Sequence, residues 1–256
     1  MRKPKNRFAL ISFCLVAVAL AWGISGCDSA RDDSSDGNRV ETSQASGVAS
    51  LELETAQVAT SIQMTTRTEG SGVEFSYANG EASNRYTILE TLGGGVGVLD
   101  FDADGAADLF LPGGGGIATT DEISGRQSVL YRNETEWKFR DVTVLAGLSR
   151  ADIYTHGVAI CDYDQDGFRD ILVTGYGPLQ FYRNQGDGTF GDVAEEAGLG
   201  SKTWGTSAAF ADVTGDGHPD LYVCNYVNWS FENDPVCQAS HGRNRDACSP
   251  RRFEPL

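Results

Sequence analysis

The sequence has few basic residues and very few histidines, and both shortages narrow the functions it can carry. Its 256 residues include 20 Lys and Arg against 36 Asp and Glu, a formal net charge of −16. A nucleic-acid-binding protein needs a basic surface, which this composition does not supply. The three histidines, His156, His218 and His241, accompany no Ser or Cys in a recognisable nucleophile motif. The sequence therefore predicts no catalytic residue and no nucleic-acid partner.

A phosphate-binding loop is also missing. Two glycine runs, residues 93–95 and 113–116, are followed neither by the start of a helix nor by Gly-Lys-Ser/Thr. We interpret both as turns at strand edges and assign no residue to an organic cofactor.

The six cysteines show no zinc-binding pattern. Cys237 and Cys248 stand in a stretch rich in Pro and charge, and they are the natural disulfide pair in an oxidising compartment. Cys161 and Cys224 lie in apolar stretches, where a buried thiol and a disulfide both remain open.

The amino-terminal residues predict export. Four basic residues precede the apolar run of residues 8–22, which is short for a membrane-spanning helix, although an uncleaved anchor is the alternative. Residues 24–27, Ile-Ser-Gly-Cys, resemble the lipobox of bacterial lipoproteins, which implies a signal peptide of residues 1–26 and lipidation of Cys27. Residues 27–61 are rich in Ser, Asp and Gly without aromatics and would form a flexible tether. We expect a lipoprotein of the cell envelope, on the periplasmic face of the inner membrane or at the outer membrane.

Three stretches, residues 100–108, 162–170 and 212–220, share one acidic pattern. Counted from the first residue, carboxylates stand at positions 1, 3, 5 and 9 and Gly at position 6; only Thr214, at position 3 of the third stretch, departs. Alternating carboxylates in a tight loop suit a hard cation that takes six to eight oxygen ligands, and we predict calcium. The alternative is an ordinary Asp-Gly hairpin turn, which three copies in the same context argue against.

Short apolar runs flank each acidic stretch, so each is predicted to be the loop of a β-hairpin. Position 12 falls in the outgoing strand as Leu111, Val173 or Val223, where a helix-loop-helix calcium site would need Glu. Upstream, residues 73–77 alternate in polarity and predict a half-buried strand that ends in a turn at residues 79–80.

A second pattern repeats between the loops. Tyr-Arg-Asn occurs at residues 131–133 and 182–184, and Ala-Gly-Leu follows at 146–148 and 197–199. Each unit is then four strands, one into the loop, one out and a further hairpin, which is typical of a propeller blade.

The loops and repeats together resemble the FG-GAP or VCBS-type repeats of integrin α-subunit heads, cartilage acidic protein and bacterial secreted proteins. The resemblance covers about residues 73–256 and implies an all-β propeller of about seven four-stranded antiparallel blades. In a repeat region of residues 62–256, blades would span 86–148, 153–199 and, incompletely, 203–256. We therefore expect part of a longer ring, because the third unit lacks its Tyr-Arg-Asn hairpin. The resemblance implies calcium ligation by Asp100, Asp102, Asp104, Asp108, Asp162, Asp164, Asp166, Asp170, Asp212, Asp216 and Asp220, with the third site weaker.

Two classes of function follow from the resemblance. The favoured one is a calcium-stabilised, non-catalytic binding or adhesion module on a lipid anchor, with an extracytoplasmic protein or glycan as its ligand. The other is a propeller enzyme, a polysaccharide lyase or a quinone-dependent dehydrogenase, with catalytic residues in blades outside this chain. Trp137, Trp204 and Trp229 could stack on sugars, but we expect them to pack between blades.

Overall fold

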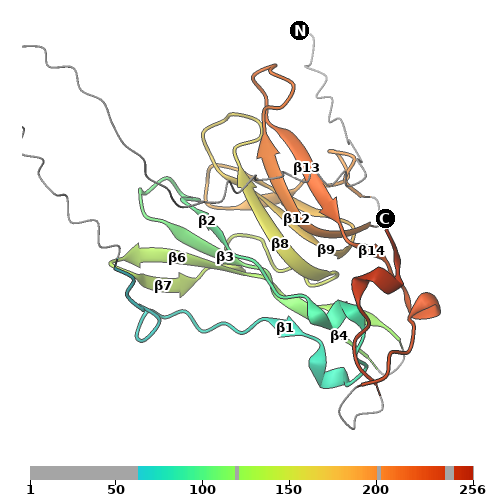
Figure 1. The fold of residues 1–256 in the computed structure, drawn as a ribbon. Coiled ribbons are helices and arrows are strands. Elements are labelled where there is room, and N and C mark those ends of the chain that lie inside the picture. Colours follow the sequence, from blue (N-terminus) through green and yellow to red (C-terminus); the bar gives the residue numbers. More distant parts are fainter. Residues whose placement is uncertain (1–62, 119–120, 201–202, 240–244, 256) are drawn as a thin grey trace, which may run out of the picture. The chain divides into compact units, whose positions relative to one another are not determined.

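The computed structural model describes residues 63–118, 121–200, 203–239 and 245–255 (Figure 1). The predicted signal peptide, Cys27 and the tether of residues 27–61 lie outside these residues. From Thr66 onward, the described residues belong to one compact unit. Within the described part of the chain, no helix is long and apolar enough to cross a membrane.

The described residues form strands and short 3-10 helices only, which confirms the predicted all-β, partial propeller fold. Within this compact body, the first repeat unit is a four-stranded antiparallel sheet in the order β2-β3-β6-β7. Its register pairs Val98 with Leu109 and Phe110 with Leu130. The strands are β2 (Gly97–Leu99), β3 (Asp108–Leu111), β6 (Val129–Thr135) and β7 (Lys138–Asp141).

The second unit repeats this arrangement, with antiparallel strands in the order β8-β9-β10-β11. Its innermost strand, β8, packs beside the innermost strand of the first unit and beside that of the third. The four strands are β8 (Tyr154–Cys161), β9 (Asp170–Gly177), β10 (Gln180–Asn184) and β11 (Phe190–Asp192).

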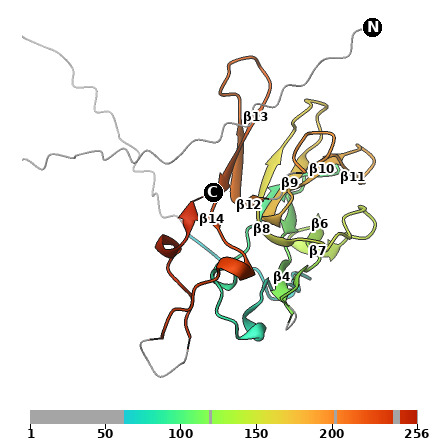
Figure 2. The same cartoon turned by 90° about the vertical axis from the view of Figure 1, so that its right-hand side faces the viewer.

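The third unit consists of one hairpin, β12 (Thr203–Ala211) and β13 (Asp220–Asn225). The start of β12 also pairs with the end of β9, through Trp204 and Tyr176. In Figure 2 the hairpin stands beside β8 and β9. No third or fourth strand of this unit occurs among residues 203–239 and 245–255.

The sheets pack face to face, and the burial of β9 explains why its residues 171–173 are all apolar. Ile171 and Val173 pack toward the first unit, Leu172 packs toward the third, and each is 0% exposed. A strand buried on both faces has no polar side in its sequence. Burial of each such side chain contributes about 1.5–3 kcal/mol, so the contacts between units hold the repeats together.

A separate layer forms at the end of the sheets away from the acidic loops. The residues before β2, those between β3 and β6, and those after β13 all leave the sheets at that end, and their aromatic and aliphatic side chains share one cluster that includes Tyr154, Trp204 and Trp229. Its elements are β1 (Ala78–Asn79), η1 (Glu81–Ser83), η2 (Ile88–Thr91), β4 (Gly114–Ile117), β5 (Ile123–Gly125), β14 (Val227–Asn228), η3 (Phe231–Asn233), η4 (Pro250–Arg252) and β15 (Glu254–Pro255).

This layer corrects two expectations. Residues 73–77 alternate in burial as predicted but are not a strand; the strand is β1, which pairs in parallel with β4. The glycine run at 113–116, interpreted as a turn, supplies most of β4. Glycine is required there because a Cβ on Gly114 would lie 2.0 Å from the Ala78 carbonyl oxygen, and one on Gly115 would lie 2.6 Å from Tyr154 Cδ2.

The tryptophans differ in burial, and the cysteines differ in whether they form a disulfide. Trp204 and Trp229 are buried in the core, whereas Trp137 is 59% exposed on the β6–β7 turn, contrary to the expected packing between blades. Cys237 and Cys248 form a disulfide. Cys161 and Cys224 are free thiols in the structure, the first half-buried and the second exposed.

Candidate metal centre

The three acidic loops join β2 to β3, β8 to β9 and β12 to β13, and they share one backbone conformation. Positions 4 and 6 both have left-handed φ angles in every copy. At position 6 these are 86° for Gly105, 96° for Gly167 and 85° for Gly217, which explains the repeated glycine. At position 4, Ala103 and Gln165 accept the same conformation at some cost, while the third loop uses Gly215.

The carboxylate at position 1 closes its own loop. Asp100 accepts hydrogen bonds from the amides of Asp104 and Gly105, at 3.1 and 2.9 Å. Asp162 accepts the equivalent pair, both at 3.0 Å, and Asp212 accepts three such bonds. Hydrogen bonds to the position 1 carboxylate therefore fix the backbone conformation of each loop without a bound ion.

The carboxylate at position 9 fastens the loop to the sheet. Asp108 accepts from the amide of Phe101 at 3.0 Å and from that of Asn133, on β6, at 2.8 Å. Asp170 makes the same two bonds, to Tyr163 and to Asn184 on β10. Burial raises the pKa of both carboxyls to about 6, although these hydrogen bonds act in the opposite direction.

Arginines on β6 and β10, the third strand of the first and of the second unit, form ion pairs with the carboxylates at loop positions 3 and 5. Arg132 Nε lies 2.6 Å from Asp102 Oδ2, and its Nη2 donates to Asp104 at 2.9 Å. In the second unit Arg183 Nε lies 2.6 Å from Asp164 Oδ2, and its Nη2 lies 3.1 Å from Asp166. Sequence reasoning missed this role, although Tyr-Arg-Asn, the repeated signal that carries it, was recognised.

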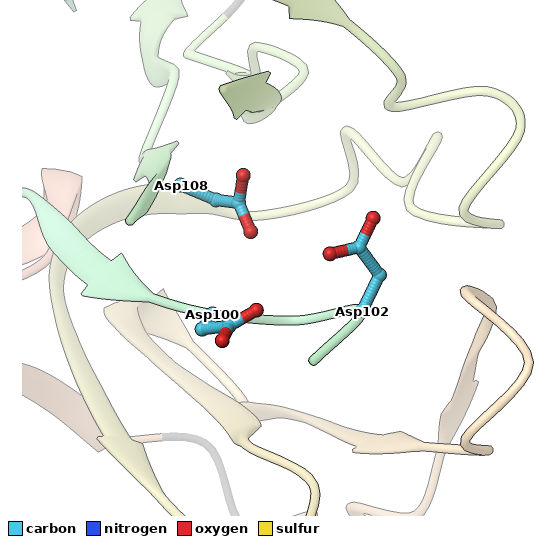
Figure 3. A group of neighbouring side chains, drawn as sticks. All are labelled: Asp100, Asp102 and Asp108. Carbon is cyan, nitrogen blue, oxygen red and sulfur yellow. The ribbon is translucent and has the colours of Figure 1, made fainter. Parts of the chain in front are cut away.

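The structure brings two groups of carboxylates together. In each group, one oxygen per residue lies within 4.8 Å of the others; the groups are Asp100, Asp102 and Asp108, and Asp162, Asp164 and Asp166. Figure 3 shows the carboxylates of Asp102 and Asp108 facing one another, with Asp100 beside them. These clusters could hold a metal ion.

The other predicted ligands lie outside the two groups. These include Asp104 and Asp170, although their counterparts in the other loop, Asp166 and Asp108, make the same hydrogen bonds and belong to a group. Among the described residues, the third loop's carboxylates do not form a group of this kind. These acids are Asp212, Asp216 and Asp220, and their ligation stays a prediction.

An orphaned oxygen in each group supports the fit to a hard cation. Asp102 Oδ1 and Asp164 Oδ1 are both buried without a hydrogen-bond partner, while the other oxygen of each residue pairs with arginine. An unpartnered buried carboxylate oxygen is costly unless a cation or donor meets it. The donor set is all oxygen, which suits calcium better than a thiolate- or imidazole-preferring metal.

Residues 100–173 and 162–223 match the family described as FG-GAP-like repeat. The chain contains FG-GAP-like repeats. It is similar to cartilage acidic protein 1 of Mus musculus, 36% identical over 123 residues, which are 45% of this chain and 18% of that protein. The Homo sapiens protein of that name is 36% identical over 119 residues, 44% of this chain and 17% of the relative. The chain thus spans less than a fifth of either relative. The FG-GAP-like repeats suggest a β-propeller-type binding or adhesion module.

The buried histidine has a structural place away from the FG-GAP loops. His156 Nε2 accepts from the Trp204 indole at 3.0 Å, and its Nδ1 lies 3.1 Å from the Tyr77 hydroxyl. Burial lowers the pKa of His156 to about 4, so the ring is neutral near pH 7. His218, at position 7 of the third loop, donates its backbone amide to Asp216.

Proposed function

We propose that this chain is a calcium-stabilised, non-catalytic binding or adhesion module, carried outside the inner membrane on a lipid at Cys27. The single observation that carries calcium is that each of two loops holds a group of three carboxylates with one buried oxygen, at position 3, that has no hydrogen-bond partner. A cation at each group would neutralise carboxylates whose mutual repulsion otherwise opposes the folded loops.

Calcium would act on the scaffold. The loops connect the innermost strands to their neighbours, and Asn184 reaches from the second unit to the Phe101 carbonyl of the first loop, at 2.7 Å. A cation that fixes the first loop would therefore also support the contact between units. The exposed loops would then present a recognition surface on a rigid frame, for an extracytoplasmic protein or glycan.

A calcium titration by calorimetry tests the proposal. Two sites are expected to bind measurably, in the first and second loops, with weaker or no binding at the third, where Thr214 offers a neutral oxygen in place of a carboxylate. Absence of heat in the unaltered chain would remove calcium from the proposal.

A thermal melt with and without chelator gives an independent readout. A ligand that binds only the folded state adds about 2.7 kcal/mol per site at a hundredfold excess over its dissociation constant. The melting temperature is expected to fall in chelator and to recover when calcium is restored. Magnesium at the same concentration is the control, since it demands a smaller, near-octahedral site.

A further inference from the structure

The arginine of each Tyr-Arg-Asn strand has a role that the acidic loops alone do not reveal. We propose that Arg132 and Arg183 are positioning residues for the two calcium sites, each holding the carboxylate at position 3 so that one of its oxygens faces the ion. This inference rests on the calcium binding proposed above and concerns what builds each site.

The first loop shows the arrangement. Asp102 has two oxygens with different surroundings: Oδ2 forms an ion pair with Arg132, whose Nε lies 2.6 Å away without hydrogen-bonding geometry, whereas Oδ1 is buried and has no hydrogen-bond partner. Asp102 belongs to the carboxylate group, together with Asp100 and Asp108. The guanidinium therefore takes one oxygen and leaves the other for a cation. A planar fork can also pair with a second carboxylate, and Nη2 does so with Asp104.

The second loop repeats each contact. Asp164 Oδ2 lies 2.6 Å from Arg183 Nε, Asp164 Oδ1 is buried without a partner, and Arg183 Nη2 lies 3.1 Å from Asp166. The two loops differ at positions 2, 4, 7 and 8, yet the two oxygens of the position 3 carboxylate are divided in the same way, which indicates a shared arrangement.

The strand that carries each arginine pairs in a fixed register with the strand that leaves the acidic loop. Leu109 pairs with Tyr131, and Ile171 pairs with Tyr182, so the following arginine lies beside the loop in both units. The next residue along, an asparagine, donates its amide to the position 9 carboxylate, at 2.8 Å in one unit and 2.9 Å in the other. The third strand thus fixes the carboxylates at positions 3 and 9 together.

The third loop is a natural comparison that lacks the device. Thr214 replaces the carboxylate at position 3, and residues 203–239 and 245–255 supply no third strand and no arginine to this unit. Its loop backbone still closes through Asp212, yet its acids form no group within ligand distance of one another. Loop closure alone does not assemble the carboxylates.

Arginine could instead compete with the ion, and the two roles predict opposite results. Substitution by lysine separates them, because lysine keeps the positive charge but loses the planar fork. If the arginine competed, weaker pairing would raise calcium affinity. If it positions Asp102, the lysine variant binds calcium more weakly. Residues that orient metal ligands typically contribute 10- to 100-fold to metal affinity, so we expect at least about a tenfold loss.

The experiment measures calcium affinity by calorimetry, one loop at a time. Arg132→Lys is compared with its parent in a background that disables the second loop, Asp162→Asn, and Arg183→Lys in a background that disables the first, Asp100→Asn. Arg140→Lys is the matched control, because Arg140 lies opposite Arg132 on β7 and pairs with Glu134 outside the loops.

The expected result is a loss of at least about tenfold in each lysine variant and no change in Arg140→Lys. A purely structural arginine would lower the melting temperature equally with calcium and with chelator and would leave the affinity unchanged. Unchanged or raised affinity in Arg132→Lys and Arg183→Lys would overturn this inference alone. No binding in the unaltered chain would overturn the calcium proposal and this inference with it.

Discussion

Asn184 offers a sharp test of how the repeated units are joined. Its side chain is fully buried, its Nδ2 donates to the Phe101 carbonyl at 2.7 Å, and its Oδ1 accepts from the Gly186 amide at 3.0 Å. Nδ2 also lies 3.3 Å from the Arg169 carbonyl. Asn184→Ala removes all three bonds at once.

The expected destabilisation follows from the groups left behind. A buried polar group that loses its partner costs about 1–3 kcal/mol, and the buried Phe101 carbonyl becomes such a group, whereas water can reach the exposed Gly186 amide, so Asn184→Ala is expected to cost about 1–3 kcal/mol. The equivalent residue of the first unit, Asn133, is half-buried, and its Nδ2 makes one bond, to Ala107 at 3.2 Å. Asn133→Ala is therefore expected to cost less than about 1 kcal/mol.

The assay is urea unfolding in chelator, followed by tryptophan fluorescence, so that calcium binding does not enter the comparison. The two alanine variants remove the same atoms from the same motif position, and their difference reports the contact between units. Equal losses in the two variants, or a neutral Asn184→Ala, would refute the reasoning.

Three further predictions concern the rest of the chain. Cys27→Ser is expected to release the protein from membranes, and a variant that still fractionates with them would favour an uncleaved anchor. His156 has a folded pKa lowered to about 4, below its ordinary value of about 6.5, so the folded state binds fewer protons between these values. Stability should therefore fall by up to about 3 kcal/mol as the pH drops from 6.5 to 4, and the fall should be smaller in His156→Gln; equal pH profiles would contradict this. Replacing both Cys237 and Cys248 by Ser should cost about 2–4 kcal/mol under oxidising conditions, whereas Cys161→Ser, at a free thiol, should cost far less; a neutral double variant would show that the disulfide adds no stability.

Sequence patterns predicted the repeated units because their signals are local. The acidic spacing and its glycine fix a turn, and apolar runs on either side fix the strands, so the hairpins around each loop needed no long-range information. For example, the apolar residues 171–173 indicated a strand, and the structure places them in β9, buried on both faces.

The separate layer at the end of the sheets away from the acidic loops was harder to predict because its contacts join residues distant in sequence. β1 pairs with β4 although two blade strands, β2 and β3, lie between them in the sequence, and the glycines of β4 leave room for the Ala78 carbonyl and the Tyr154 ring. A glycine run with no side chains carries no periodicity, so it was interpreted as a turn.

The site was partly visible in the sequence. The eleven aspartates could be named from spacing and resemblance, but the role of each depends on which backbone amide or arginine donates to its carboxylate. Position 1 closes the loop, position 9 binds the third strand, and position 3 is shared with an arginine about thirty residues later in the first unit. That last contact is set by strand register, which spacing within the loop does not contain.

The most direct measurement of the central claim is a crystal structure of the chain grown with limiting calcium, with anomalous scattering used to locate the ions. We predict ions in the first and second loops, within about 2.3–2.6 Å of Asp102 Oδ1 and Asp164 Oδ1, with Arg132 and Arg183 still on the opposite oxygens. The third loop should show weaker density or none. Empty first and second loops, or an ion bound there by carboxylates that had left their arginines, would contradict the account.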